Sequence, residues 1–312
     1  MKVLITGTHF TPAVAVIQQI KKIPNIKVIY VGRKTTLEGD RSQSVESKVL
    51  PLLGVKYISL ITGRLQRSFT IFTIPSLLKI PIGFVQALYI ILTEKPNVIL
   101  SFGGYVSVPV VIIGWLFSVP IIVHEQTLVS GLANRISSYF ADKIAVSFEK
   151  SGPKNEKVVL TGNPLREEIL HPIQIGGEYK KFLNLATDLK LPTILITGGN
   201  QGSHVINLVL EEVLEKLTKI ACVIHITGDN KFNDFERLEK LQNERYVVKK
   251  WMGDDYGAVL SKADLIISRS GINTLMELAF FGKPALVIPI PYLYHDEQNK
   301  NAKYFAPIKI IW

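Results

Sequence analysis

Short β-branched runs alternate with longer amphipathic segments along most of the chain. Runs such as residues 2–6 and 193–197 are apolar and short, as in strands that are buried in a parallel sheet. The segments between them repeat apolar residues at helical spacing. This alternation predicts an α/β protein with parallel sheets covered by helices.

The pattern predicts strands and helices in both halves of the chain. Strands are predicted over residues 2–6, 27–31, 56–59, 97–101, 120–123, 143–146, 157–160, 193–197, 221–226, 246–249, 264–267 and 285–288. Helices are predicted over residues 12–22, 42–51, 80–94, 105–117, 130–139, 203–217, 231–242, 254–261, 272–280 and 296–304. A linker over 161–166 and a docking helix before about residue 190 separate the two series.

Size and composition agree with two globular domains, predicted at residues 1–163 and 164–312. Hydrophobic residues make up 47% of the chain and charged residues 20%, which excludes a disordered chain. The single cysteine, Cys222, excludes an internal disulfide and is expected to be an inert buried thiol. The chain begins as a strand, without the pattern of a secretory signal.

The net charge of +10 is compatible with a nucleic acid, an anionic membrane or a phosphorylated substrate as the partner. Because the basic residues are spread along the chain and no nucleic-acid-binding motif occurs, we expect no nucleic acid. The mean hydropathy of +0.25 indicates membrane contact.

The most apolar stretch covers residues 69–93 and is interrupted by Pro75, Lys79, Pro81 and Gln86. A spanning helix needs about 20 uninterrupted apolar residues, so we expect a surface element that dips into an anionic membrane. Its predicted apolar patch and basic fringe are Phe69, Ile71, Phe72, Leu77, Leu78, Ile82 and Phe84, with Arg64, Arg67 and Lys79. The alternative is an ordinary buried helix with a loop.

A glycine turn follows the strand predicted over 193–197 and precedes a helix. It contains Gly198, Gly199, Gln201, Gly202 and Ser203. Backbone N–H groups and the positive end of a helix bind phosphates without help from a cationic side chain. The turn therefore predicts a diphosphate site in the second half of the chain, unless it is only a tight turn.

Polar residues also follow the strands predicted in the first half. His9, before Pro12 at a predicted helix start, is a candidate proton acceptor or merely a helix cap. Gly103 and Gly104 form a second glycine turn, which either binds an anion or packs closely. The sequence His124-Glu125-Gln126 ends an apolar strand, but H-E-x-x-H is absent, so we predict no metal.

Two further groups of polar residues occur near the end of the chain. Arg269, Ser270 and Gly271 open a helix, and Glu277 lies about two turns into it. Glu277 either accepts both hydroxyls of a ribose or is an ordinary solvated glutamate. Asp296, Gln298 and Asn301 either bind a sugar or are ordinary residues of a helix N-terminus.

Taken together, these loops closely resemble those of the MurG family of bacterial cell-wall glycosyltransferases. The segments that carry the resemblance are His9-x-x-Pro12-Ala13, Gly103-Gly-Tyr-Val-Ser107, His124-Glu-Gln126, Gly131-Leu-Ala-Asn134, Gly162-Asn-Pro-Leu-Arg166, Gly198-Gly-Asn-Gln-Gly202, Arg269-Ser-Gly271, Glu277 and Asp296-x-Gln298-x-x-Asn301-Ala302. Each segment is weak alone, but their common order along nearly the whole chain is a strong signal. The resemblance implies a GT-B fold, with two Rossmann-like doubly wound domains facing across a cleft.

The resemblance also implies an activity. It is the inverting, metal-independent transfer of N-acetylglucosamine (GlcNAc) from UDP-GlcNAc to the MurNAc C4 hydroxyl of lipid I, which forms lipid II in peptidoglycan synthesis. The implied partners are UDP-GlcNAc, lipid I and an anionic membrane, with no cofactor. The implied place is the cytoplasmic face of the plasma membrane, with a role in cell shape and cell division.

The resemblance assigns roles to residues of this sequence. His9 takes the position of the general base. The implied donor-binding residues are Arg166, Gly198, Gly199, Gln201, Gly202, Ser203, Met252, Arg269, Ser270, Gly271, Glu277 and Gln298. The implied acceptor-binding residues are Thr8, Gly103, Gly104, Tyr105, His124, Glu125 and Asn134. Within the donor set, the turn and Arg166 hold the diphosphate, and the backbone of Met252 lines the uracil pocket. Glu277 takes the ribose and Gln298 the GlcNAc ring.

The chain departs from the family pattern in three places. The first loop, residues 6–9, is two residues shorter than the family's Gly-Gly-Thr-Gly-Gly-His and has fewer glycines. Thr127 stands where an asparagine is common, and the family chain continues beyond Trp312 with a helix that returns to the first domain. Two alternatives therefore stay open: a related GT-B transferase with another lipid acceptor, such as diacylglycerol, and an inactive nucleotide-sugar or lipid-binding module.

Overall fold

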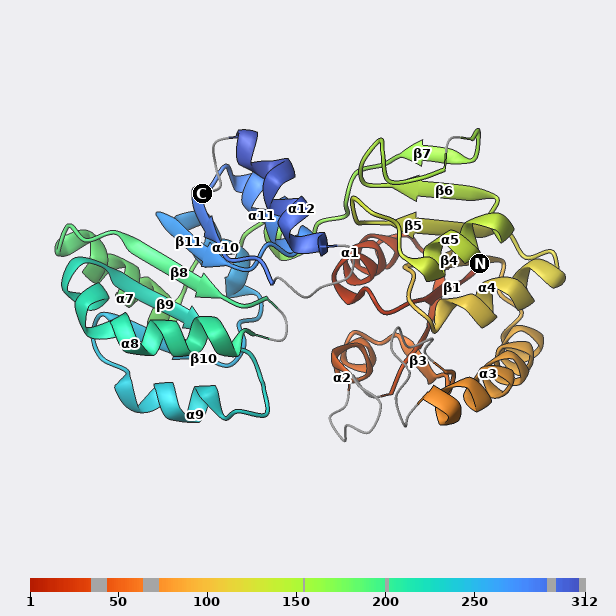
Figure 1. The fold of residues 1–312 in the computed structure, drawn as a ribbon, viewed down its shortest axis with the longest axis horizontal. Coiled ribbons are helices and arrows are strands. Elements are labelled where there is room, and N and C mark those ends of the chain that lie inside the picture. The colour runs from red at the N-terminus through yellow and green to blue at the C-terminus, as the bar shows by residue number, and fades with distance from the viewer. Residues whose placement is uncertain (35–43, 64–72, 154, 200–201, 291–295, 309–312) are drawn as a thin grey trace. The chain divides into compact units, whose positions relative to one another are not determined.

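The structure is a computed structural model that describes residues 1–34, 44–63, 73–153, 155–199, 202–290 and 296–308. The chain divides into two compact units, Met1–Arg166 and Glu167–Trp312, which are called unit 1 and unit 2 below (Figure 1). The division lies three residues after the boundary predicted from the sequence.

Within the described residues, unit 1 contains a seven-stranded parallel sheet of order β3-β2-β1-β4-β5-β6-β7. Its strands are β1 (Lys2–Thr6), β2 (Lys27–Gly32), β3 (Lys56–Ser59), β4 (Val98–Ser101), β5 (Ile121–Glu125), β6 (Lys143–Val146) and β7 (Val158–Leu160). Its helices are α1 (Phe10–Ile20), α2 (Val45–Leu52), α3 (Thr73–Glu94), α4 (Ser107–Leu116) and α5 (Leu132–Phe140). The strand order reverses between β1 and β4.

Alternate residues of β1 face two different helix layers. Leu4 lies in one apolar cluster with Ile91 of α3 and Val110 of α4. Ile5 lies in another cluster, with Ile17 of α1. Since successive side chains of a strand point to opposite faces, both faces of the sheet are buried.

Within the described residues, unit 2 contains a five-stranded parallel sheet of order β10-β9-β8-β11-β12, which reverses between β8 and β11. Its strands are β8 (Thr193–Thr197), β9 (Cys222–Ile226), β10 (Tyr246–Lys249), β11 (Leu265–Ser268) and β12 (Ala285–Val287). Its helices are α6 (Glu167–Leu170), α7 (Gly177–Asp188), α8 (His204–Ile220), α9 (Asp234–Leu238), α10 (Asp255–Lys262), α11 (Ile272–Phe281) and α12 (Glu297–Phe305), with short 3₁₀ helices η1 (Glu239–Leu241) and η3 (Ala306–Ile308).

The prediction of two doubly wound, Rossmann-like α/β domains is confirmed. Every predicted strand is present, with ends within two residues of those expected. The helices agree less closely, because the helix predicted over 231–242 is only α9 followed by η1.

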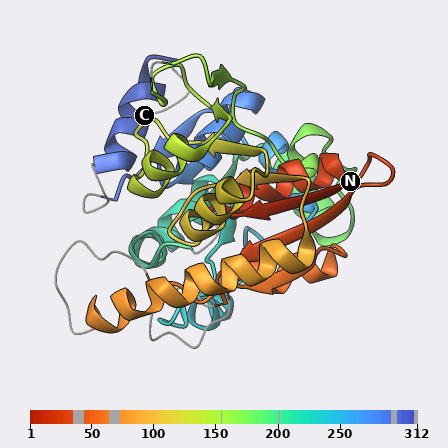
Figure 2. The same ribbon diagram turned by 90° about the vertical axis from the view of Figure 1, so that its right-hand side faces the viewer.

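The structure corrects the prediction for the apolar stretch of unit 1. A single helix, α3, begins at Thr73 and not near residue 80, and Figure 2 shows it without a break. Pro75 stands in the first turn, where a missing N–H costs no helical hydrogen bond. Pro81 removes only the bond to the carbonyl of Leu77, so neither proline ends the helix.

One side of α3 packs in the core and the other side exposes apolar side chains. Ala87 and Ile90 are buried in the core of unit 1, whereas Val85 and Tyr89 are 68% and 69% exposed. Residues 76–94 are long and apolar enough to cross a membrane by length and composition. Because the buried side of this helix belongs to the core, a helix on the surface of the unit fits better.

The predicted apolar patch is only partly correct. Leu77, Leu78 and Ile82 are exposed, but Phe84 packs against the core, so its place in the patch was wrong. The exposed side instead continues through Val85 and Tyr89. Phe69, Ile71, Phe72, Arg64 and Arg67 lie outside the described residues.

The contact of α6 with α10 leaves no room for a side chain at Gly257. A Cβ there would lie 1.7 Å from the carbonyl oxygen of Glu168, which is backbone and yields little. We expect Gly257→Ala to lower the free energy of unfolding by about 1–3 kcal/mol, measured by urea unfolding. The control is Gly253→Ala, where the nearest atom would be 3.5 Å away. An equal loss in both variants would contradict this packing.

Candidate functional site

In each unit, glycine-containing loops meet where the strand order reverses. In unit 1 these are the loops after β1 and β4, and in unit 2 the loops after β8 and β11. Doubly wound sheets bind ligands at this place, outside the carboxyl ends of the strands. Each unit therefore carries one candidate site.

In unit 1 the two loops pack backbone against backbone. Thr8 donates its N–H to the carbonyl of Gly103 over 3.0 Å, and a Cβ on Gly7 would lie 2.8 Å from the backbone of the β4 loop. Gly104 has a φ of +83°, and a Cβ there would lie 2.1 Å from Thr8 Oγ1. The close packing expected as one alternative is present, and it places Thr8 beside the second glycine turn. Tyr105 packs against the core next to it.

His9 is the N-cap of α1, but its side chain makes no capping hydrogen bond. The alternative that it merely caps the helix is therefore wrong. Desolvation lowers the pKa of His9, although the charge of Glu125 raises it, and Arg33 lowers it further. A lowered pKa keeps the imidazole neutral near pH 7, the form that accepts a proton.

A buried tyrosine holds the loop that leads to His9. The hydroxyl of Tyr30, on β2, donates to the carbonyl of Gly7 over 3.0 Å. Burial raises the pKa of Tyr30, so the hydroxyl keeps its proton. Sequence analysis did not identify Tyr30, because nothing in a strand residue indicates which loop it supports.

The polar end of β5 is held together by Glu125. Its carboxylate accepts hydrogen bonds from Asn134 Nδ2 over 2.8 Å and from the N–H and hydroxyl of Thr127 over 3.0 and 2.7 Å. Thr127, which departs from the family pattern, thus supports Glu125 directly. The carboxylate is engaged inside the fold, and its contact with an acceptor stays a prediction.

Two buried acceptor atoms beside this carboxylate are unpaired. Burial lowers the pKa of His124 to about 4, although a contact with the Gly162 carbonyl raises it. That carbonyl lies 3.5 Å from Nε2, so Nε2 carries the proton and Nδ1 is an acceptor. Among the described residues, neither His124 Nδ1 nor Asn134 Oδ1 has a hydrogen-bond partner. Such atoms suit the hydroxyl of a ligand.

In unit 2 the turn after β8 is compact. A Cβ on Gly198 would lie 2.2 Å from the backbone of Gly202, and a Cβ on Gly202 would lie 1.8 Å from the carbonyl oxygen of Thr227. Gly199 has a φ of +78°, and no atom of the residues that the structure describes lies within 4 Å of a Cβ position there. The turn thus requires glycine for close approach on one side and for backbone conformation on the other.

The N–H groups of this turn are partly engaged within it. Gly199 donates to Thr197 Oγ1 over 3.2 Å, and Gly202 donates to the Gly199 carbonyl over 2.9 Å. The Ser203 hydroxyl accepts from the N–H of Ile206 as the cap of α8. The N–H groups of the first helical residues, His204 and the residue after it, have no partner within the helix and are available to an anion. Gln201 lies outside the described residues.

A buried network supports the turn from behind. Asn207 Nδ2 donates to the Thr227 carbonyl over 3.1 Å, and Asn207 Oδ1 lies 2.9 Å from His225 Nε2. Because Oδ1 can only accept, His225 carries its proton on Nε2, and its Nδ1 accepts from the Tyr246 hydroxyl over 3.0 Å. Thr227 is the residue whose carbonyl packs against Gly202, so the network fixes the turn.

Asp234 is the buried charge of this network. It accepts from Asn207 and Asn230 and pairs at 2.8 Å with both His204 Nδ1 and an Arg237 Nη2. Burial raises the pKa of Asp234, but the hydrogen bonds from these residues lower it overall. His204, the first residue of α8, is held by this carboxylate. Sequence analysis did not identify the members of this network, because they are scattered over several segments of the chain.

The loop after β11 reaches the same turn. Arg269 Nη1 donates to the Gly202 carbonyl over 3.1 Å, and burial lowers the pKa of the guanidinium. The Ser270 hydroxyl donates to the Gln298 carbonyl over 2.8 Å, and Asn301 Nδ2 donates to the Ser270 carbonyl over 3.1 Å. The structure therefore brings together Gly202, Arg269, Ser270 and Gln298 of the predicted donor set.

The remaining donor candidates have different positions. Glu277 on α11 is only 4% exposed, so the alternative of a solvated glutamate is wrong. Gly271 is the N-cap of α11, and Met252 is buried after β10. Arg166 is the last residue of unit 1, and its role at a donor site stays a prediction. Within the described ranges, no cluster of three His, Cys, Asp or Glu could hold a metal ion.

Comparisons with known proteins cover both units of the chain. The glycosyltransferase family 28 N-terminal domain matches residues 4–146, and the glycosyltransferase family 28 C-terminal domain matches residues 193–309. A UDP-N-acetylglucosamine--N-acetylmuramyl-(pentapeptide) pyrophosphoryl-undecaprenol N-acetylglucosamine transferase of Clostridium kluyveri is 34% identical, over 93% of this chain and 79% of that protein. The protein of the same name from Clostridium novyi is 35% identical, over 97% and 83%. The crystal structure of Acinetobacter baumannii MurG has a TM-score of 0.68 and 26% identity, over 99% and 84%.

The buried histidines predict a loss of stability in acid. Histidine in the unfolded chain takes up a proton near pH 6.5, whereas the folded-state pKa is about 3 for His225 and about 4 for His124. Between these values the unfolded chain binds more protons, so the free energy of unfolding falls as the pH falls. The expected slope is up to about 1.4 kcal/mol per pH unit for each histidine.

Urea unfolding between about pH 7 and pH 4.5 measures this slope. His225→Asn should lower this slope by the contribution of one histidine, because the variant has one fewer group that takes up a proton on unfolding. His171→Asn is the control, because His171 has a side chain that is 75% exposed, and this variant should keep the wild-type slope. A full slope in His225→Asn would show that His225 does not contribute.

Proposed function

This chain belongs to the MurG family of glycosyltransferase family 28, and on that premise we propose that it transfers GlcNAc from UDP-GlcNAc to lipid I. The reaction joins the sugar to the MurNAc C4 hydroxyl with inversion and without a metal, and it yields lipid II for peptidoglycan. The names of the relatives support the transferase activity and both substrates. Cell-wall synthesis of this kind serves cell shape and cell division.

The turn between β8 and α8 is the observation that carries the proposal. Transfer of the sugar leaves negative charge on the UDP, and preorganised dipoles at that place stabilise it. The N-terminus of α8 provides free N–H groups, and the Arg269 guanidinium is bonded to the carbonyl of Gly202 in the same turn. Each such donor typically contributes about 3 kcal/mol to the transition state.

Each of the other donor residues contacts a different part of the nucleotide sugar. The buried carboxylate of Glu277 takes the ribose hydroxyls, and the backbone of Met252 lines the uracil pocket. Gln298 Oε1 already accepts the N–H of Ile290 over 2.9 Å. Its NH₂ group is therefore the part that contacts the hydroxyl oxygens of GlcNAc. Arg166 adds positive charge beside the diphosphate.

On the acceptor side, His9 acts as the base for the MurNAc hydroxyl. Its neutral imidazole and the loop held by Tyr30 suit this role. Thr8 and the turn at Gly103 and Gly104 bind the acceptor diphosphate, and the unpaired atoms of His124 and Asn134 take hydroxyl groups. The hydrogen bonds from Tyr30 to Gly7 and from Thr8 to Gly103 keep the shortened first loop in place despite its missing glycines.

The membrane contributes the lipid acceptor, and the exposed side of α3 suits a peripheral contact with it. Leu78, Val85 and Tyr89 are each more than two-thirds exposed and lie on this side. An apolar helix face beside basic residues binds the surface of an anionic bilayer. We propose that the protein binds the cytoplasmic face of the plasma membrane, and the exposed side of α3 supports the peripheral contact.

Turnover with both substrates tests the proposed reaction. We expect UDP release from UDP-GlcNAc only when a lipid I analogue is present. Since general-base catalysis contributes about 10²–10⁴-fold, His9→Ala should lower kcat by that factor and leave UDP affinity near the wild-type value. Glu277→Ala is the matched counterpart and should weaken UDP binding by about tenfold or more.

The outcomes of these assays separate the alternatives. UDP release with diacylglycerol and not with the lipid I analogue would show that the acceptor is diacylglycerol and not lipid I. Binding of UDP-GlcNAc without any turnover would favour an inactive binding module. An unchanged kcat in His9→Ala would remove this residue as the base.

Vesicle flotation tests the membrane contact. The double variant Val85→Glu, Tyr89→Glu adds two charges to the exposed side of α3, so we expect at least tenfold weaker binding to phosphatidylglycerol vesicles. Ile220→Glu is the control, because Ile220 is 65% exposed at the end of α8 in unit 2. Equal losses in both proteins would mean that α3 is not the contact.

A further inference from the structure

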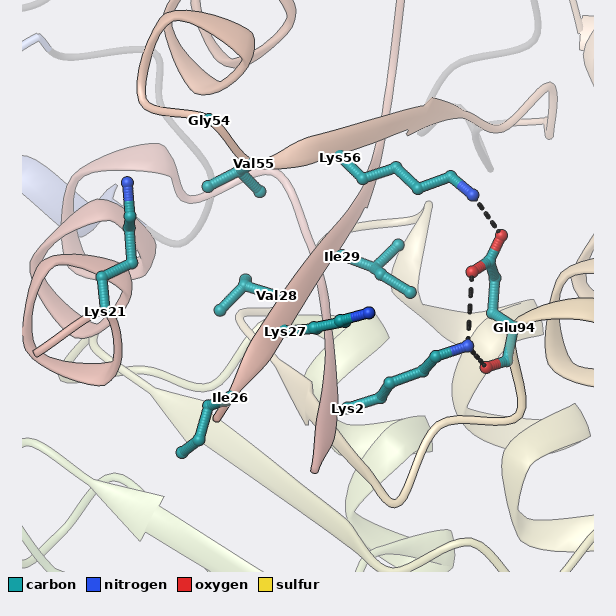
Figure 3. A pocket seen from close by; sticks show the side chains of 10 residues that line it. All are labelled: Lys2, Lys21, Ile26, Lys27, Val28, Ile29, Gly54, Val55, Lys56 and Glu94. Carbon is teal, nitrogen blue, oxygen red and sulfur yellow. Dashed lines mark hydrogen bonds and ion pairs between the residues drawn. The ribbon is translucent and has the colours of Figure 1, made fainter. Parts of the chain in front are cut away.

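A cavity opens at the amino edge of the unit 1 sheet, the opposite edge from His9. It has a volume of about 470 Å³ and lies at the starts of β1, β2 and β3 (Figure 3). Its polar lining comes from Lys2, Lys21, Lys27, Lys56 and Glu94. Cavities of a few hundred Å³ hold small organic ligands, and none of the roles proposed above uses this one.

The strand register concentrates positive charge in this cavity. Lys2 and Lys27 are directly paired neighbours at the first residues of β1 and β2, and Lys56 begins β3. Like charges in direct register destabilise a sheet. Four lysines and one glutamate line the cavity, which leaves a net charge of +3. Lys21, Lys27 and Lys56 are exposed, so solvent screens part of their repulsion, and a bound anion would lower the remainder.

Among the described residues, three of these four lysines have a partner within the fold. Glu94 pairs with Lys56 at 2.7 Å and with Lys2 at 3.9 Å, as Figure 3 shows, and Lys2 also donates to the carbonyl of Glu94 over 2.6 Å. Lys21 donates to the carbonyl of Leu53. Lys27 is exposed, and among the described residues its ammonium has no ion-pair or hydrogen-bond partner. Capping of helix ends therefore accounts for Lys2 and Lys21 but not for Lys27.

The walls of the cavity are apolar. Ile29 and Val55, which are 3% and 4% exposed, line it together with Ile26 and Val28. A ligand with two or more negative charges and an apolar portion matches both the ammonium groups and this wall. Phosphate esters combine these properties, and an ammonium group binds phosphate as a compact point charge.

We propose that this cavity is a binding site for a phosphate-bearing anion, with Lys27 as its principal free cation. Two sources supply this chemistry: a soluble phosphate ester, or the headgroup of an anionic lipid. The exposed side of α3 favours the lipid source, because Glu94 ends this helix and Tyr89, five residues earlier, is exposed.

Titration with inorganic pyrophosphate tests the site, followed by the backbone amide signals of residues 2, 27 and 56 in NMR spectra of the full chain. We expect these signals to shift, and Lys27→Gln to weaken the binding that they report by about five- to tenfold. The matched control is Lys143→Gln, since Lys143 is an exposed first residue of β6 in the same sheet, outside the cavity. Thermal unfolding checks that both variants fold.

Vesicles of phosphatidylglycerol, compared with phosphatidylcholine, distinguish the two sources. Weaker binding of Lys27→Gln to phosphatidylglycerol, beyond that of Lys143→Gln, assigns the site to a lipid headgroup. A defect confined to pyrophosphate assigns it to a soluble phosphate. The proposal is overturned if Lys27→Gln and Lys143→Gln bind pyrophosphate equally well and also bind phosphatidylglycerol vesicles equally well. None of these measurements depends on glycosyl transfer.

Discussion

Close approach of backbone to backbone at the point of strand reversal is the constraint on which both units depend. In unit 2, Gly202 lies so near the Thr227 carbonyl that no side chain fits between them. In unit 1, a Cβ on Gly7 would lie 2.8 Å from the backbone of Phe102. Glycine at these positions lets two loops from neighbouring strands converge, and convergence places backbone N–H groups where a phosphate can bind.

Buried polar groups behind the loops hold the loop backbones in this close approach. Asn207 connects Thr227 to a fully buried carboxylate, Asp234, and to a histidine that stays neutral. In unit 1, Tyr30 and Glu125 have corresponding functions. A buried network of this kind is stable only when its members are paired. Preorganised dipoles are also what a transferase without a metal requires, because they stabilise charge without reorganising.

The two edges of the unit 1 sheet differ in chemistry for a simple reason. The carboxyl edge carries glycine loops, which suit phosphate groups, and, among the described residues, acceptor atoms without a partner, which suit hydroxyl groups. The amino edge carries lysines at strand starts, where the neighbouring helices end and cations stabilise their carbonyl groups. The long helix α3 packs Ile90 inward and exposes Val85, and this exposed side is the basis of the proposed membrane contact.

The sequence by itself determined the strands, most helices and the loops that carry the candidate residues, because burial of apolar side chains has a period that is visible locally. It also indicated His9, which stands just before a predicted helix start, and Arg269 and Glu277, which stand at and within the helix that follows a predicted strand. Only the tertiary structure decided what fixes the loops, namely the bond from Tyr30 to Gly7 and the network around Asp234, and that α3 is continuous. These contacts join residues that are far apart in the chain, and no local pattern contains a distance between them.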